Sequence, residues 1–339
     1  MLYVVLFFLV FSLLLYVVLA GADFGAGIVE LFSSEKNQQI TKKTVYRVMG
    51  PVWEANHIWI IIIMVILWVG FPGFYNILVL YLHIPLTLVL LGITLRGVAF
   101  VFRHYDAYKD KSQILYDWMF RISSLVTPIF LGMTFGAMIS GNITVTDNYE
   151  TLSFYDLFIA PWCNGFSFFV GLFFAALCAF LASVLLIGEA NEVERAIYVK
   201  KSRIATITVI ILGFVVLSYG YINETTFVIH FIKNPYAITL AALSALLILP
   251  LLRSIRRARK VTTRTFTGLQ VVLILIAALI AQYPNLIITS ESEISILETV
   301  ATDSVIKVLG ITLIIGGLVI LPGLFHLLKS FKMIKIFEQ

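Results

Sequence analysis

Long apolar runs, separated by short polar stretches, dominate the hydropathy pattern of this chain. A helix needs about 20 apolar residues to cross the hydrocarbon core of a bilayer, and runs of that length recur from one end of the sequence to the other. The pattern predicts an all-α, polytopic membrane protein with nine transmembrane helices. They are expected at residues 1–31, 51–70, 76–100, 122–140, 164–187, 204–222, 236–252, 266–284 and 306–328.

The runs follow one another without a linker long enough to mark a second domain, and no repeat of fixed period is visible. Residues 1–339 are therefore expected to form a single integral membrane domain. The first run starts without a basic segment before it, which favours an uncleaved first helix over a signal peptide. Composition agrees with a membrane protein, because the chain is 60% hydrophobic and only 13% charged, about half the charged fraction of soluble domains.

Along the chain, loops rich in Lys and Arg alternate with loops that contain few of them. The rich segments are 32–50, 101–121, 188–203, 253–265 and the tail after 328. The exceptions are Lys233 and Lys307, in the opposite loops, and Arg96, inside the third apolar run. Because loops rich in Lys and Arg stay in the cytoplasm, the pattern predicts an N-terminus outside and a cytoplasmic C-terminus. The net charge of +5 is thus explained by membrane orientation, and nucleic acid is not expected as a partner.

Two acidic side chains stand in otherwise apolar segments. Asp23 lies in Gly-Ala-Asp-Phe-Gly-Ala-Gly at 21–27, and Glu54 lies in Trp-Glu-Ala-Asn-His-Ile-Trp at 53–59. A charged side chain at a helix centre costs roughly 2.5–3.5 kcal/mol on the mildest scales, and proton handling is a common reason to keep one. With the predicted orientation, both acids and Arg96 lie in the cytoplasmic part of the membrane. The sequence therefore predicts a polar path entering from that side, although a purely structural ion pair between Asp23 and Arg96 is the alternative.

Glu54 and His57 are three residues apart, so they can share one face of a helix. A carboxyl group beside an imidazole can relay a proton, since imidazole titrates near neutral pH. The alternative is that Glu54 only stabilises the start of its helix, where the helix dipole favours an acid. The residues expected to support this pair are Trp53 and Asn56.

The other histidines provide no convincing haem or metal site. His83, His104, His230 and His326 lie far apart in sequence and nothing pairs them. A lone histidine is more often a hydrogen-bonded packing residue than an axial ligand. We therefore assign no metal ligand and expect no cofactor held by this chain's own side chains.

Together, the two acidic motifs resemble those of subunit II of the cytochrome bd-type quinol oxidases. That family typically shows Gly-Phe-Asp-x-Gly-x-Gly, followed by Trp-Asp/Glu-x-Asn-x-x-Trp, and this chain has both motifs in this order. The similarity continues through Leu-Arg-Gly-Val-Ala-Phe at 95–100, Tyr-Asp-Trp at 116–118, Gly165, Gly188-Glu189, Tyr283-Pro284 and Ser290.

The resemblance implies a nine-helix subunit of a respiratory enzyme of the bacterial cytoplasmic membrane, which oxidises quinol and reduces oxygen to water. It implies that haem b, haem d and the quinol-oxidising loop belong to the larger partner, subunit I. Subunit II is expected to support that partner in a heterodimer, to which small single-span subunits can be added, and to contribute acids to a cytoplasmic proton path. Contacts with membrane lipid and quinone are also compatible with the family. The positions carried over are Asp23 and Glu54, with Trp53, Asn56 and Arg96 beside them.

Two departures from the family pattern bear on this path. Ala22 replaces a common Phe, and Val101 stands where many members have an acid. A relay step at that position is therefore missing or relocated. Asp106 is one possible substitute, although it is expected nearer the surface.

Two other functions are compatible with buried acids. A proton-coupled secondary transporter also keeps acids within the membrane, but such proteins often show inverted repeats and broken helices near the midplane. No repeat is visible here. A purely structural assembly factor would use the acids only for ion pairs.

Overall fold

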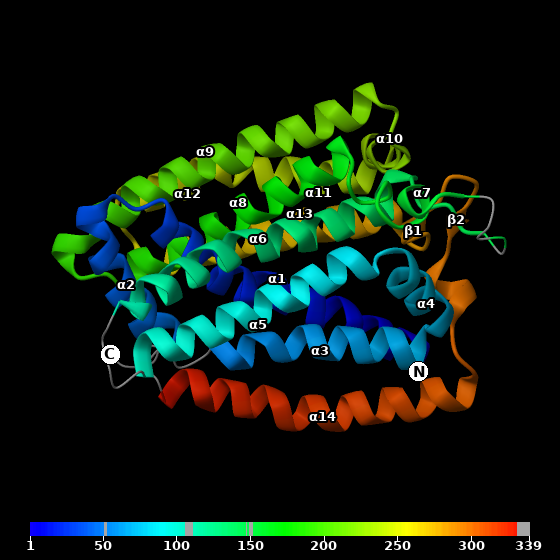
Figure 1. Cartoon of the computed structure of the whole chain (residues 1–339), viewed down its shortest axis with the longest axis horizontal. Helices are drawn as coiled ribbons and strands as arrows, with labels where there is room; N and C mark the ends of the chain where they lie inside the picture. Colours follow the sequence, from blue (N-terminus) through cyan, green and yellow to red (C-terminus); the bar gives the residue numbers. More distant parts are fainter. Residues whose placement is uncertain (51–52, 106–110, 147, 149–151, 331–339) are drawn as a thin grey trace.

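The computed structural model describes residues 1–50, 53–105, 111–146, 148 and 152–330. Within these residues, nine helices are long and apolar enough to cross a membrane, which confirms the predicted polytopic helical fold. The long helices run along one common direction, with α9 and α14 at opposite edges of the bundle (Figure 1). Two short strands lie at one end of the bundle and α2 lies at the other (Figure 1).

Shorter elements lie between some of the long helices. The spanning helices are α1 (Leu2–Leu31), α3 (Trp53–Gly70), α5 (His83–Tyr105), α6 (Ser112–Ser140), α8 (Gly165–Glu189), α9 (Glu192–Ile222), α11 (Pro235–Leu246) continued by α12 (Ile248–Arg256), α13 (Lys260–Gln282) and α14 (Asp303–Ser330). The shorter elements are α2 (Glu35–Met49), α4 (Pro72–Tyr81), α7 (Phe154–Phe158), α10 (Thr226–Lys233), the antiparallel strands β1 (Ile287–Ile288) and β2 (Glu293–Ile294), and the 3₁₀ helix η1 (Ile296–Thr299).

Several predicted boundaries are wrong because helices continue into polar sequence, which a hydropathy criterion ignores. Helix α6 begins at Ser112 rather than at residue 122, and α9 begins at Glu192 rather than at residue 204. The expected loop 32–50 contains the amphipathic helix α2. The polar ends of these helices therefore extend beyond the apolar runs that a hydropathy criterion detects.

The third predicted span is interrupted. Instead of one helix from residue 76, the chain forms α4, which ends at Tyr81, and then α5. Pro85 lies just after the break, and a proline ring both lacks an N–H and clashes with the carbonyl four residues earlier, which here belongs to Tyr81. The proline therefore accounts for the break.

Helix α1 is the centre of the fold and packs against α3, α6 and α8. Every residue from Ala20 to Glu30 is buried, so this third of α1 is enclosed on all sides. Small residues permit the close approach: a Cβ at Gly25 would overlap the carbonyl oxygen of Cys178 on α8, and a Cβ at Gly27 would overlap the Ser124 side chain on α6. The Asp23 side chain is thereby placed inside protein.

Gly25→Ala is expected to lower the thermal unfolding midpoint of the purified protein, since inserting a methyl group into a well-packed core typically costs about 1–3 kcal/mol. Gly268→Ala in α13 is the matched control, because a Cβ there meets no atom within 4 Å. In the control, the better helix propensity of alanine is expected to leave stability unchanged or to raise it by up to about 1 kcal/mol. Equal effects of the two substitutions would contradict the close packing of α1 against α8.

Candidate functional site: two buried ionic clusters

Asp23 and Arg96 form a buried, bidentate ion pair between α1 and α5. Arg96 Nη1 donates to Asp23 Oδ2 at 2.6 Å, and Nη2 donates to Oδ1 and to the backbone oxygen of Asp23, both at 2.9 Å. Arg96 Nε donates to Ser124 Oγ of α6 at 3.0 Å. The two charged residues are 0% and 1% exposed. A fork-to-fork guanidinium–carboxylate pair is among the strongest hydrogen-bonded geometries, and it offsets the cost of burying both charges.

His57 of α3 adjoins this pair. Its Nε2 lies 3.7 Å from Asp23 Oδ2, and its ring lies near those of Phe24 and Tyr16, at centroid distances of 5.6 and 6.3 Å. Among the described residues, the buried His57 Nδ1 has no hydrogen-bond partner. We refer to Asp23, His57, Arg96 and Ser124 as the first cluster.

Two buried hydroxyl groups lie on α1 on the N-terminal side of the first cluster. Ser12 and Tyr16 precede Asp23 by eleven and seven residues, spacings that keep all three on one side of a helix. Both hydroxyls are buried and have no hydrogen-bond partner within the described part of the chain. Since buried polar groups usually find a partner, ordered water included, this line is suited to holding water between the first cluster and the middle of α1.

A second cluster lies further toward the end of the bundle that holds α2. Arg103 Nη2 donates to Glu30 Oε1 at 2.8 Å, and Arg103 Nε lies 3.0 Å from Asp117 Oδ1. Lys42 Nζ of α2 donates to the same Asp117 oxygen at 2.6 Å, and Arg121 Nε lies 3.8 Å from Glu30 Oε1. We call Glu30, Lys42, Arg103, Asp117 and Arg121 the second cluster.

The second cluster runs from the buried interior to the surface. Glu30 is 1% exposed, whereas the side chains of Lys42 and Asp117 are 20% and 17% exposed. The Oε2 atom of Glu30 is buried and has no partner among the described atoms. The cluster therefore joins a carboxyl group with one uncommitted oxygen to ionisable groups that water can reach.

A single aromatic ring separates the two clusters. The fully buried Phe120 has the guanidinium carbon of Arg96 at 4.9 Å and that of Arg103 at 4.5 Å from its ring centre. Both are cation–π distances. Asp23 and Glu30 are seven residues apart on α1, which at 1.5 Å per residue corresponds to about 10 Å. The two clusters thus form consecutive levels of one buried ionic column.

The structure does not bring Glu54 into this column. Glu54 is exposed in the first turn of α3, and no contact between Glu54 and His57 is found among the described side chains. An acid in the first turn fits the alternative that Glu54 only stabilises the start of its helix, where the helix dipole favours a negative charge. Its neighbours face inward: Asn56 is buried, and the Trp53 ring packs against Phe100 at 5.4 Å.

Of the two departures from the family pattern, Ala22 is buried on α1 directly before Asp23, whereas Val101 is not part of the column. Val101 is 40% exposed on α5, and Asp106 lies outside the described residues, as do Pro51 and Val52 of the second motif. The Nδ1 atoms of His83 and His104 lie 2.9 Å from the backbone oxygens of Leu80 and Phe100. No three His, Cys, Asp or Glu side chains of the described chain are grouped as a metal site requires.

Sequence reasoning missed the second cluster. Arg103, Asp117 and Arg121 fall in a segment predicted to be a solvated loop, and Glu30 ends the first apolar run. One signal was available: the two acids of α1, Asp23 and Glu30, and the two arginines of α5, Arg96 and Arg103, have the same spacing of seven residues. Equal spacing on two helices allows two stacked ion pairs.

Comparisons with known proteins agree with this architecture. A family model described as cytochrome bd terminal oxidase subunit II matches residues 1–331. The chain is 30% identical over 123 residues to cytochrome bd ubiquinol oxidase subunit 2 of Bacillus subtilis (strain 168), which is 36% of each chain. It is 25% identical over 137 residues to cytochrome bd-I ubiquinol oxidase subunit 2 of Escherichia coli (strain K12), which is 40% of this chain and 35% of that one.

The matched segments therefore span only about a third of the length of these two relatives. The fold is similar over almost the whole chain to a chain in the structure of bd oxidase from Geobacillus thermodenitrificans, with a TM-score of 0.78, 18% identity, and coverage of 98% of this chain and 100% of that one. At that identity the likeness concerns the fold alone. The family match over nearly the full sequence shows that this chain belongs to the cytochrome bd terminal oxidase subunit II family.

Proposed function

We propose that this chain is the second subunit of a quinol:oxygen oxidoreductase and that its ionic column supplies protons for the reduction of oxygen to water. In this proposal the larger subunit I holds haem b and haem d and oxidises the quinol. Family membership supports the assignment, and the relatives from Bacillus subtilis and Escherichia coli are named as ubiquinol oxidase subunits. The transporter hypothesis is not supported, because the matching family is one of oxidase subunits.

The observation that carries the proton role is the arrangement of the two clusters in series. Each oxygen molecule reduced to two waters takes up four protons and four electrons. Asp117 is partly exposed and can exchange protons with water, Glu30 has a carboxylate oxygen with no partner among the described atoms, and Asp23 lies beside an imidazole. The arginines stay charged and cannot themselves carry protons, so their role is to hold the carboxyl groups in place and to balance their charge.

We further propose that the end of the bundle with α2 and the second cluster faces the cytoplasm of a bacterial cell, within a single membrane domain. The Lys- and Arg-rich segments support this orientation through the positive-inside rule. Protons would then enter at Lys42 and Asp117, pass Glu30 and the Phe120 ring with the help of water, and reach Asp23 and His57. From His57 the route would continue to the partner subunit.

Purification tests the assignment directly. A tagged chain is expected to co-purify with a larger membrane protein that shows haem absorption, and the complex is expected to consume oxygen when supplied with a soluble quinol. Isolation of the chain as a haem-free homo-oligomer that moves a solute across vesicle membranes would refute the proposal.

Glu54 is proposed to act at the surface of α3 that meets subunit I. The same surface exposes Ile58, Ile61 and Trp68, at 41%, 61% and 64%, as expected of a helix face that is covered by lipid or protein. Glu54→Gln is expected to slow oxygen reduction about tenfold, less than the roughly 100-fold or more that is typical of losing one acid–base group, because Glu54 is exposed and water can replace part of its role, while haem content stays unchanged. The measurement is oxygen uptake per haem.

Glu291→Gln is the control for this substitution, since Glu291 is also exposed but lies at the other end of the bundle, beside β2. It is expected to leave the rate unchanged. Loss of haem and of the folded complex in the Glu54 variant would show that the carboxylate is structural.

A further inference from the structure

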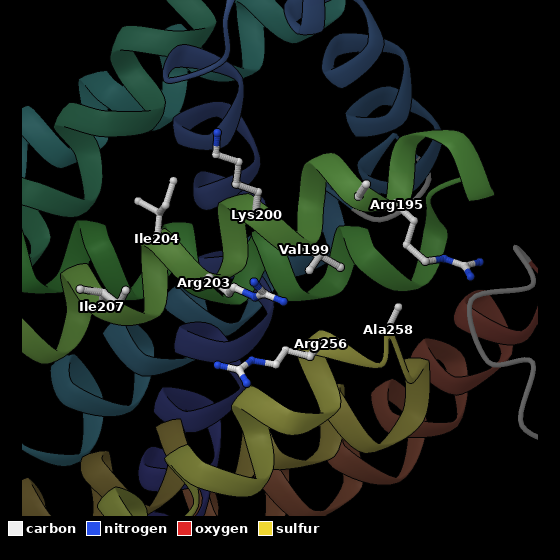
Figure 2. A pocket seen from close by; sticks show the side chains of 9 residues that line it. Arg195, Val199, Lys200, Arg203, Ile204, Ile207, Arg256 and Ala258 are labelled. Atoms are coloured by element: carbon white, nitrogen blue, oxygen red, sulfur yellow. The ribbon is translucent and has the colours of Figure 1, made fainter.

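A shallow cavity of about 740 Å³ lies between the beginning of α9 and the end of α12. It lies outside both ionic clusters, at the end of the bundle that holds α2. Its basic lining residues are Arg195, Lys200, Arg203 and Arg256. Figure 2 shows the guanidinium groups of Arg203, from α9, and Arg256, from α12, turned toward the same gap, whereas Lys200 points away from it.

No described carboxylate compensates the basic charges of this cavity. Among the side chains that the structure describes, no carboxylate forms an ion pair with Arg195, Arg203 or Arg256. Arg195 Nε is buried and has no hydrogen-bond partner within the described residues. The neighbouring Glu194 is turned toward α2, where its Oε2 lies 3.4 Å from Thr44 Oγ1.

Other arginines of this chain have a carboxylate partner, whether they are buried like Arg96 or partly exposed like Arg264, whereas Arg203 and Arg256 are exposed and have none among the described side chains. Arg96 and Arg103 each hold a carboxylate at 2.6–2.8 Å, and Arg264 holds Glu189 at 2.7 Å. Two guanidinium groups that face one gap repel each other unless an anion lies between them. Among the described side chains, no carboxylate lies between the two guanidinium groups, and an anion bound from outside could take that place.

The polarity of the cavity changes along α9. Directly after Arg203 the lining along α9 becomes apolar, with Ile204 and, one turn beyond Arg203, Ile207 at 56% and 55% exposure. Ile204 begins a stretch of exposed apolar residues on the spanning part of α9, which includes Ile210, Ile211 and Phe214. A ligand that fits this lining has an anionic group at the end of the helix and a hydrocarbon part directed along the bundle.

We propose that this cavity binds an anionic phospholipid, with its phosphate between Arg203 and Arg256 and the start of its acyl chains on Ile204 and Ile207. Arginine suits this role because its planar fork binds phosphate oxygens two at a time. Basic pockets between helices at a membrane surface are typical sites for anionic headgroups. The volume lies within the usual range for ligand sites of about 300–1,000 Å³. The site is independent of the proposed proton column.

The test uses the purified oxidase complex, stripped of lipid in neutral detergent and titrated with phosphatidylglycerol or with phosphatidylcholine of the same chains. Native mass spectrometry counts the bound lipid. We expect one tightly held phosphatidylglycerol that phosphatidylcholine does not replace. Since each arginine near a headgroup contributes about a fivefold gain in affinity, Arg203→Gln or Arg256→Gln should weaken binding about fivefold, and the double substitution about 25-fold.

Arg253→Gln is the matched control, because it removes the same charge from α12 at an exposed position that does not line the cavity. It is expected to retain the affinity of the unmodified complex. Equal losses in the control and the cavity variants would show a diffuse basic surface and overturn the site. Unchanged binding in the double variant, with its haem content intact, would also overturn it.

A free anion is the other source of a phosphate group. Inorganic phosphate at millimolar concentration is expected to leave the bound phosphatidylglycerol in place, since it lacks the hydrocarbon that contacts Ile204 and Ile207. Displacement of the lipid by phosphate alone would show that the cavity is an anion site and would refute the lipid assignment.

Discussion

Asp23→Asn is expected to lower the free energy of unfolding by about 3–5 kcal/mol, the usual cost of removing one partner from a buried ion pair. The substitution would leave the Arg96 guanidinium, 1% exposed, without its carboxylate. Phe24 and Phe120 contact its guanidinium carbon at 5.3 and 4.9 Å and offset only part of the charge. The measurements are the thermal unfolding midpoint and the yield of assembled, haem-containing complex.

The double variant Asp23→Asn/Arg96→Gln separates structure from proton transfer. Because it removes both charges together, it is expected to regain most of the lost stability. If Asp23 carries protons, oxygen uptake per haem in the double variant stays about 100-fold lower than in the unmodified complex. Recovery of both stability and rate would show that the ion pair is purely structural, and the proposed path would then bypass Asp23.

Glu30→Gln is expected to slow oxygen reduction about 100-fold, a typical effect of losing an acid–base group, while the complex still assembles. Assembly should survive because Arg103 keeps a second carboxylate, Asp117 at 3.0 Å, and the glutamine oxygen can still accept from Arg103. The loss of rate should come from the carboxyl group's ability to take up and release a proton. Oxygen uptake per haem is the measurement.

Glu35→Gln is the control for Glu30→Gln. Glu35 is an exposed acid in the first turn of α2, close in sequence to Glu30 and outside the second cluster. Its substitution should leave the rate unchanged. A Glu30 variant that consumes oxygen within about twofold of the normal rate would mean that protons enter elsewhere and that the second cluster only holds helices together.

Much of the fold could be predicted from the sequence because a membrane span is a local property. About 20 consecutive apolar residues identify it, and all nine predicted spans have a counterpart within the described chain. The ends of the helices were harder to predict from the sequence. Residues 112–121 and 192–203 are polar enough to resemble loops, yet they continue α6 and α9, because a helix can extend past the membrane when neighbouring helices pack against it.

The candidate site, like the fold, could be predicted only in part from the sequence. Asp23 is conspicuous because an acid in an apolar run is costly, and Arg96 because it is a cation inside a span. Glu30 and Arg103 were not recognised, since at the ends of their runs they look like ordinary surface charges. Glu54 looked equivalent to Asp23 in sequence, but the structure places it on the exposed side of α3.

By itself, the sequence determined the number of spans, the two acidic motifs, the family and the asymmetry of basic charge, all of which depend on residue type and order. Only the tertiary structure decided which charges meet. Asp23 with Arg96 and Glu30 with Arg103 are each 73 residues apart, and Arg203 reaches the same cavity as Arg256 from another helix. Such pairings depend on which helix faces pack together, and the close approach of α1 to its neighbours at Gly25 and Gly27 sets that packing.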